Sequence, residues 1–244
     1  MESFYLEDKT KDLYSFLFPT LERLSFKPDT EIVTNNIMKR DIIIYGAQAS
    51  GKTGTAQRIV EEACKLYDPH NVNAISCTGS RSAYVFDYGL DKRLVQIFFF
   101  DDFTLEEVPK AILQNFFKSR NIWFKKKGVA FGLIIKIFST HRYHSLIQEF
   151  RTNCDVLISK SYPMNPYDES VLRRFYKDEG MRDLALIEKN KADNPYWNSY
   201  NIFHTKFNNG IAVIPIATQN FTKDLFLPEE LDLILRLKEF GFSI

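Results

Sequence analysis

A short glycine-containing segment constrains the fold of this 244-residue chain more than any other feature. Residues 42–57, IIIYGAQASGKTGTAQ, pass from an apolar run into a loop of small residues and then into a helical pattern. The loop matches G-x-x-x-x-G-K-[ST] from Gly46 to Thr53. This context predicts a strand–loop–helix unit whose backbone N–H groups and helix N-terminus face phosphate oxygens.

The loop residues are expected to make separate contacts with a nucleoside triphosphate such as ATP. Lys52 would reach the β and γ phosphates and act in catalysis, and the Thr53 hydroxyl would bind Mg²⁺. The predicted nucleotide-binding residues are Gly46, Ala47, Gln48, Ala49, Ser50, Gly51, Lys52, Thr53 and Gly54. The alternative is a chance glycine-rich turn with a surface lysine, which the strand and helix patterns on either side disfavour.

From residue 41 onward, short apolar runs alternate with longer helical patterns, as in βαβ units. Near-continuous apolar runs suit strands covered on both faces, so we predict an α/β three-layer sandwich with a mainly parallel sheet. The expected strands are 41–46, 72–76, 94–100, 132–139 and 154–159. The expected helices are 52–67, a segment after Thr104 reaching about Lys125, and 144–151.

Both ends of the chain add elements to this core. Residues 1–40 form an amphipathic, helical lead-in to a domain over 41–244. Near the C-terminus, two strand patterns predict a β-hairpin, closed by a triplet that tolerates positive φ, namely Asn208, Asn209 and Gly210. A short helix capped by Gly241 follows.

The composition gives no global electrostatic preference. The chain has 32 basic and 31 acidic residues, so any polyanion site must be a local patch. Its three cysteines show no CxxC pairing, and the first residues lack the layout of a signal peptide. Nothing approaches the roughly 20 apolar residues of a membrane helix, so we expect a cytoplasmic protein with reduced thiols and no membrane partner.

A second strand pattern, LVQIFFF at residues 94–100, ends in two acids. Asp101 and Asp102 would lie at the C-terminal end of this strand, where open α/β sheets bind ligands. Asp101 is expected to hold Mg²⁺, directly or through water, and Asp102 to position or deprotonate the attacking water. Because Asp102 has a short side chain, Glu106 and Glu107 remain alternatives for the base. The two acids would otherwise be ordinary strand-end or N-cap carboxylates.

Polar residues also follow the strand expected at 132–139. Thr140, together with Ser139, stands where a side chain could sense the γ phosphate. Arg142 and Arg151 flank a short helix, from which a guanidinium could stabilise transition-state charge within the subunit or across an interface. Each arginine could equally form a cap or a surface ion pair.

Two other side-chain types in this region have simpler interpretations. His141 and His144 lie three residues apart without a nearby carboxylate or thiol, so polar loop histidines are favoured over metal ligands. Cys154 begins a buried strand pattern, which favours a core residue over a nucleophile.

The order of these elements resembles the additional-strand P-loop ATPases. Within that group the chain is most similar to the HerA and FtsK type of DNA translocase and to the related genome-packaging ATPases of viruses. The similarity covers about residues 41–160, from the Walker A loop and the Walker B strand to STHRYHSLIQEFRTNCDVLI. Positions matching this last motif are Thr140, Arg142, Arg151, Asn153 and Asp155, while His141 stands where Gln is common.

The resemblance implies a homo-oligomeric ring that hydrolyses ATP at its subunit interfaces, with Mg²⁺, while double-stranded DNA passes through the pore. Such a protein would act in the cytoplasm, that of a host cell if it is viral. The chain departs from the group at Asp102, where many hydrolysing relatives have Glu, and over residues 160–244, which match no named pattern.

Other functions share these motifs. An initiator or helicase loader of the AAA+ group would need a helical lid with a sensor arginine, and residues 161–193 are helix-rich and contain Arg173, Arg174 and Arg182. A hairpin at 200–216 that returns to the sheet favours the translocase. A non-hydrolysing ATP-binding switch is favoured by Asp102. A small-molecule kinase is the weakest alternative, because no substrate lid with paired arginines is evident.

The segment KSRNIWFKKKG, residues 118–128, is a candidate DNA contact. Five basic residues surround Trp123 and Phe124, a composition suited to phosphate contacts with stacking. The basic residues are Lys118, Arg120, Lys125, Lys126 and Lys127. In the expected strand order the segment would lie away from the nucleotide, and a solvated helix end is the equally favoured alternative.

Overall fold

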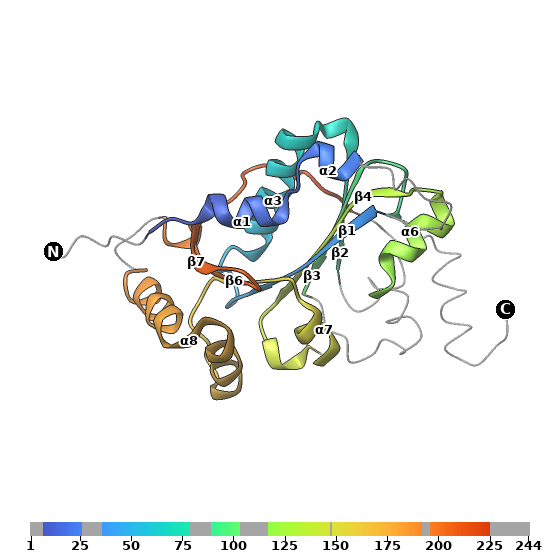
Figure 1. Cartoon of the computed structure of the whole chain (residues 1–244). Helices are drawn as coiled ribbons and strands as arrows, with labels where there is room; N and C mark the ends of the chain where they lie inside the picture. Colours follow the sequence, from blue (N-terminus) through green and yellow to red (C-terminus); the bar gives the residue numbers. More distant parts are fainter. Residues whose placement is uncertain are drawn as a thin grey trace.

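Eight strands of the computed structural model form one sheet in the order β7-β6-β5-β1-β4-β3-β2-β8 (Figure 1). The structure describes residues 7–25, 36–78, 89–102, 117–146, 148–191 and 196–224. The strands are β1 Asn36–Tyr45, β2 Val72–Thr78, β3 Val95–Asp101, β4 Phe131–Thr140, β5 Val156–Ser159, β6 Tyr200–Thr205, β7 Asn209–Val213 and β8 Lys223–Asp224. Only the β5–β6 and β6–β7 pairings among them are antiparallel, which confirms the mainly parallel sheet.

Helices cover both faces of the sheet. The α-helices are α1 Thr10–Leu17, α2 Leu21–Ser25, α3 Lys52–Tyr67, α6 Ser119–Lys127, α7 Gln148–Asn153 and α8 Pro166–Lys189. Short 3-10 helices are η1 Pro69–Asn71, η2 Tyr143–Ser145 and η3 Trp197–Ser199. Within the described part of the chain, no helix is both long and apolar enough to span a membrane.

The two layers of helices enclose two separate cores. Ile42 and Ile44 of β1 pack in the core that includes α1, α2 and α3, whereas Ile43 and Tyr45 pack in the core of α6, α7 and α8. This division follows from the alternation of side chains along a strand. Figure 1 shows the same arrangement, with α1–α3 on one side of the sheet and α7 and α8 on the other. The predicted three-layer sandwich is therefore confirmed.

The central strands bring three chain segments to one edge of the sheet. β4 pairs in parallel with both β1 and β3, with Tyr45 opposite Thr140 and Phe100 opposite Phe138. The carboxyl ends of β1, β4 and β3 therefore meet, because parallel strands in register end together. The glycine loop, the polar residues after β4 and the two acids after β3 all follow from these ends.

Most expected elements agree closely with the structure. The helix expected at 52–67 coincides with α3, and each of the five predicted central strands overlaps an observed one. The helix expected at 144–151 is instead the 3-10 helix η2 followed by α7, which begins at Gln148. The helix predicted before Gly241, and most of the one predicted between Thr104 and Lys125, lie outside the described residues.

The C-terminal hairpin is confirmed, but of the predicted closing triplet only Asn208 lies in the turn. β7 begins at Asn209, so Asn209 and Gly210 lie in the strand, and neither is among the described residues with positive φ. The Thr205 hydroxyl accepts the N–H groups of Phe207 and Asn208 at 3.2 and 2.9 Å. This side-chain cap closes the turn without left-handed residues.

The N-terminal lead-in belongs to the same core as the sheet. Leu13, Leu17 and Leu24 are fully buried against the face that α3 covers. The Lys9 N–H donates to the Ile211 carbonyl of β7 at 2.8 Å, so the segment also contacts the hairpin. β1 begins at Asn36, before the boundary expected at residue 41.

Helix α6 carries most of the basic segment predicted to contact DNA. The position of Trp123 in this helix contradicts one part of that prediction, the stacking on bases. Trp123 is fully buried, and its Nε1 donates to the Asp91 carbonyl at 2.7 Å. A Cβ at Gly132, where φ is +139°, would lie 2.7 Å from the indole ring. The predicted stacking of Trp123 on nucleic acid is therefore wrong, because the ring is packed inside the protein.

We predict that Trp123→Ala lowers the free energy of unfolding by about 3–5 kcal/mol, because it removes a large buried side chain. The matched control Arg120→Ala, at an exposed position of α6, should change it by less than about 0.5 kcal/mol. Urea denaturation measures both. Loss of DNA binding by Trp123→Ala at unchanged stability would contradict this assignment.

Candidate nucleotide-binding site

The loop between β1 and α3 is held in a tight, partly left-handed conformation. Ala49 and Gly51 have φ of +58° and +86°, and α3 begins directly after Gly51. The Ala47 N–H donates to Ser161 Oγ at 2.8 Å. The Ser50 hydroxyl is buried and has no hydrogen-bond partner among the described residues. Such a loop turns several N–H groups to one side, and with its unused hydroxyl it fits a phosphate group.

Lys52 folds back onto this loop. Its Nζ donates to the carbonyls of Gly46 and Ala47 at 3.0 and 2.9 Å, and it lies 3.0 Å from His141 Nδ1. Burial lowers the pKa of Lys52, and the carboxylates of Asp102 and Asp101 oppose this effect. An ammonium group has three N–H donors, so these three acceptors use all of them.

Thr53 and Asp101 lie together, as expected for two ligands of one Mg²⁺. Thr53 Oγ1 and Asp101 Oδ2 are 3.2 Å apart. Neighbouring ligands of an octahedral Mg²⁺, each about 2.1 Å from the ion, are about 3 Å apart, so the pair fits this ion. The Ser139 hydroxyl donates to the other oxygen, Asp101 Oδ1, which fixes the carboxylate. Ser139 therefore orients the carboxylate of Asp101, and its expected contact with the γ phosphate stays a prediction.

Asp102 and His141 form a side-chain contact that the sequence did not predict. Asp102 Oδ1 lies 2.9 Å from His141 Nε2. Asp102 has φ of +45°, and its N–H donates to Ser139 Oγ at 3.1 Å. Left-handed backbone at a non-glycine residue is strained unless neighbours hold it, and such strain concentrates at functional sites.

The other predicted catalytic residues lie nearby but have different contacts. The Thr140 hydroxyl donates to the Arg142 carbonyl and accepts its N–H, both at 3.1 Å. Arg142 is exposed, while Arg151 lies half-buried in α7. Burial raises the pKa of Tyr143, and the positive charge of Arg151 opposes that rise. The roles of Thr140, Arg142 and Arg151 remain predictions, and Glu106 and Glu107 lie outside the described residues.

The remaining members of the sequence motif have structural contacts. Asp155 Oδ2 accepts the Asp41 N–H at 2.8 Å, which ties β5 to β1. His144 contacts the buried Asp168 through its N–H and Nδ1, at 2.8 and 3.0 Å. Burial raises the pKa of Cys154, which disfavours the thiolate and agrees with a core residue.

Gly54 is enclosed by the segment that follows the hairpin. Its carbonyl accepts the Ala217 N–H at 3.2 Å. A Cβ at Gly54 would lie 2.0 Å from Ile216 Cγ2, and one at Gly51 would lie 2.4 Å from Ile216 Cδ1. Gly54 therefore allows chain packing against the start of α3, a role that the loop motif does not specify.

Lys160 is a buried cation beneath the loop that sequence reasoning missed. Its Nζ donates to Thr55 Oγ1, the Asn198 carbonyl and Asn201 Oδ1 at 2.7, 2.7 and 2.9 Å. Burial, with a further contribution from the charge of Lys52, lowers the pKa of Lys160 to about 7. The only feature of the sequence that could have indicated this buried lysine is its position directly after the apolar strand β5.

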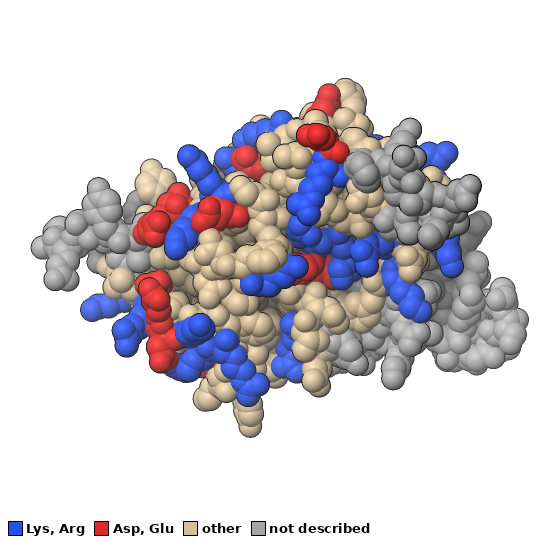
Figure 2. Space-filling model, viewed as in Figure 1, with Lys and Arg blue, Asp and Glu red and all other residues tan. Residues whose placement is uncertain are grey.

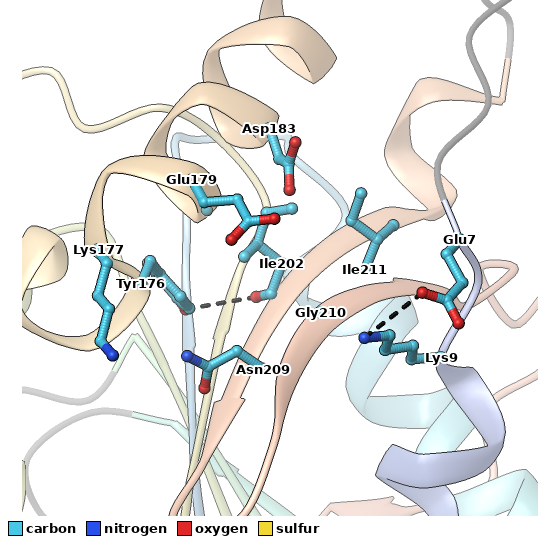
Figure 3. Close-up of a pocket in the computed structure, with 11 residues that line it drawn as sticks. Glu7, Lys9, Tyr176, Lys177, Glu179, Asp183, Ile202, Asn209, Gly210 and Ile211 are labelled. Carbon is cyan, nitrogen blue, oxygen red and sulfur yellow. Dashed lines mark hydrogen bonds and ion pairs between the residues drawn. The ribbon is translucent and has the colours of Figure 1, made fainter.

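A cavity elsewhere on the molecule has no connection with this loop. It has a volume of about 380 Å³ and lies between α8 and the β6–β7 hairpin, at the β7 edge of the sheet (Figure 3). Its lining includes Tyr176, Asp183 and Ile211, together with Lys9 and Glu7, which are 3.5 Å apart. It is separate from the predicted site, which lies at the carboxyl ends of the central strands.

The fold and the loop together define a class. β4 lies between the strand that leads into the phosphate loop and the strand that ends in Asp101, which is the arrangement of an additional-strand P-loop NTPase fold. No protein-family model and no curated protein matches the sequence.

Solved structures similar to this chain include viral and bacterial proteins. The genome packaging NTPase B204 of Sulfolobus turreted icosahedral virus 2 is similar in its complex with sulfate, at 13% identity and a TM-score of 0.49 over 74% of this chain and 98% of that chain. Its complex with ATP-gammaS gives 12% identity and a TM-score of 0.46, covering 76% and 100% of the two chains. A RuvB mutant of Thermotoga maritima gives 14% and 0.36, covering 55% and 43%.

We predict that Gly54→Ala destabilises the protein by about 1–3 kcal/mol, because the new methyl group overlaps Ile216. In an Ile216→Ala background the same change should be neutral or stabilising by up to about 1 kcal/mol, since Ala favours helix. A double-mutant cycle measured by urea denaturation tests this coupling. Equal effects of Gly54→Ala in both backgrounds would exclude the contact.

We also predict a pH dependence of stability that comes from Lys160. Its pKa is about 7 in the folded protein against an ordinary 10.5, so between these values the unfolded chain binds more protons. Its contribution therefore makes the free energy of unfolding rise with pH over this window and fall towards pH 7. Lys160→Met should remove this component, whereas Lys118→Met at an exposed site should not. Urea denaturation of both proteins at pH 7 and pH 9 gives the change in the free energy of unfolding between the two pH values. The same change in Lys160→Met and in the wild type would refute the prediction.

Proposed function

We propose that the protein is an ATP-hydrolysing motor that translocates or packages double-stranded DNA, working as a homo-oligomeric ring. The observation that carries the proposal is the meeting of Lys52, the Thr53–Asp101 pair and Asp102 at one edge of the sheet. Phosphate binding alone would require only the loop. Hydrolysis additionally needs a carboxylate that holds Mg²⁺ and a group that acts on the attacking water, and Asp101 and Asp102 are the candidates for these roles.

The residues divide the chemistry of hydrolysis among them. The loop N–H groups and Lys52 would bind the phosphates, and Thr53 and Asp101 would hold Mg²⁺. Bound there, Mg²⁺ would neutralise charge on the phosphate oxygens. Asp102 would help to activate the attacking water, and Arg142 or Arg151 would supply positive charge to the transition state, within the subunit or from a neighbour.

The hairpin supports a translocase over an AAA+ initiator or helicase loader. β6 pairs antiparallel with β5, with Val156 opposite Thr205, so the chain returns to the sheet after α8. In α8, which is kinked at Lys177, Arg173 is paired with Glu169 at 2.7 Å and with Asp178. These acids engage the guanidinium of Arg173, which disfavours this one of the three candidate sensor arginines.

A basic surface at the opposite end of the sheet supports a DNA partner. Arg120, Lys125 and Lys126 are exposed on α6, the helix that leads to the amino end of β4, and Lys118 is exposed directly before it. Figure 2 shows Lys and Arg side chains gathered in the middle of one face. Phosphate contacts are favoured over base stacking, because Trp123 is buried.

A non-hydrolysing switch protein is the second candidate. Asp102 has a shorter side chain than the Glu of many hydrolysing relatives, and Lys52 has all three donors engaged within the protein. A chain that binds ATP in this state and does not turn it over would serve as a switch.

Steady-state ATP hydrolysis with Mg²⁺, measured with and without double-stranded DNA, tests the proposal. We predict turnover that DNA stimulates and that Lys52→Ala lowers at least about 100-fold, because the lysine contacts transition-state charge. The control Lys65→Ala, at the exposed end of α3, should keep its turnover. No turnover by the wild type under either condition would reject both motor hypotheses in favour of the switch, and turnover insensitive to DNA would reject DNA as the partner.

A further inference from the structure

We infer that His141 and Asp102 form a general-base dyad in which His141 Nδ1 takes the proton of the water that attacks the γ phosphate. This inference rests on the proposed ATP hydrolysis and names the group that deprotonates the water. It assigns to Asp102 the role of orienting His141 instead of acting on the water itself.

The hydrogen-bond partners define the tautomer of His141. A carboxylate only accepts hydrogen bonds, so the 2.9 Å contact with Asp102 Oδ1 requires a proton on His141 Nε2. An ammonium only donates, so the 3.0 Å contact with Lys52 requires a lone pair on Nδ1. The neutral Nε2–H tautomer satisfies both. With this tautomer the Gly46 carbonyl, 3.3 Å from Nδ1, accepts its hydrogen bond from Lys52 and not from the ring. An imidazole whose one nitrogen donates to a carboxylate presents a basic lone pair on the other, as in other acid–histidine pairs.

Nucleotide binding would free this lone pair. Lys52 holds three acceptors, the carbonyls of Gly46 and Ala47 and His141 Nδ1, and has no fourth donor. To bind a phosphate oxygen it must release one of them. Release of His141 leaves Nδ1 without the lysine donor. The atom then lies beside the loop that receives the phosphate, 3.3 Å from the Gly46 carbonyl.

The surroundings hold the dyad in place yet leave it open to water. The left-handed backbone of Asp102 is fixed by Ser139, which also binds Asp101. The side chains of His141 and Asp102 are 40% and 67% exposed, so solvent reaches them. Among the described residues, the charged groups in contact with His141 are Lys52 on α3 and Asp102, which directly follows β3 and lies next to Asp101 in the chain.

Hydrolysis forms one bond to the γ phosphorus and breaks another. The water oxygen forms a bond to the γ phosphorus, and the bond from that phosphorus to the bridging oxygen breaks, with its electron pair leaving on ADP. The water proton moves to His141 Nδ1, and from there to solvent. Histidine also supplies the reach that Asp102 lacks, because the imidazole lies between the carboxylate and the loop.

Four proteins test the dyad: the wild type, His141→Gln, the double variant His141→Gln/Asp102→Glu, and the control His144→Gln. His141→Gln should lower kcat by about 10²–10⁴-fold while keeping its affinity for a non-hydrolysed ATP analogue, since it removes only the base. The double variant should regain at least about tenfold over His141→Gln, because the longer carboxylate reaches the water directly. His144, whose partner is Asp168, should tolerate Gln without loss of kcat.

The outcomes separate the two proposals. Turnover by the wild type with full kcat in His141→Gln would overturn the dyad and leave ATP hydrolysis standing. A double variant no faster than His141→Gln would also overturn it, because a purely structural histidine is not replaced by a longer acid. Lack of turnover in the wild type would reject the proposed function itself. Thermal unfolding of each variant shows that it is folded.

Discussion

The parallel pairing of β4 with both β1 and β3 determines where every candidate site residue lies. Because the three strands run in register, their carboxyl ends meet, and the loop, the acids and His141 follow from them. Without β4 between them, the strand bearing the loop and the strand bearing Asp101 would pair directly. The segment that carries Ser139 and His141 would then have no place between the two.

Buried polar groups connect the strands and the helix that carry the candidate site. Lys160 links α3, β5 and β6 through Thr55, the Asn198 carbonyl and Asn201. Deeper in the sheet, the fully buried Lys136 of β4 lies 3.0 Å from Asp41 of β1. Buried charges and polar groups contribute little net stability but are costly to break, so they favour one arrangement of strands. These contacts favour the strand arrangement that positions the phosphate loop at the carboxyl end of β1.

Much of the fold could be predicted from local patterns. Near-continuous apolar runs define the central strands, and the glycine loop marks the start of α3, because both depend on residues that are neighbours in the chain. The Thr53–Asp101 pair was also predictable, since it follows from the positions of two strand ends. The hairpin turn was misplaced because the Thr205 side chain replaces the backbone conformation that Asn and Gly usually supply.

The contacts that determine the chemistry were not predictable from local patterns. His141 meets Lys52 and Asp102 only because β4 lies between their strands, and no spacing in the sequence encodes this. Lys160 and Ile216 reach the loop from segments that match no known motif. Likewise, the burial of Trp123 depends on Gly132 and Asp91, residues that are distant from it in the chain.

Thermal unfolding of the wild type and Lys52→Ala over a series of MgATP concentrations tests the central claim most directly. If the loop binds the triphosphate through Lys52, the Tm of the wild type should rise with the MgATP concentration. At 100 times Kd, binding should add about 2.7 kcal/mol to the free energy of unfolding. The Tm of Lys52→Ala should rise much less. An equal rise in both proteins, or none in the wild type, would contradict the assignment of this loop as the nucleotide site.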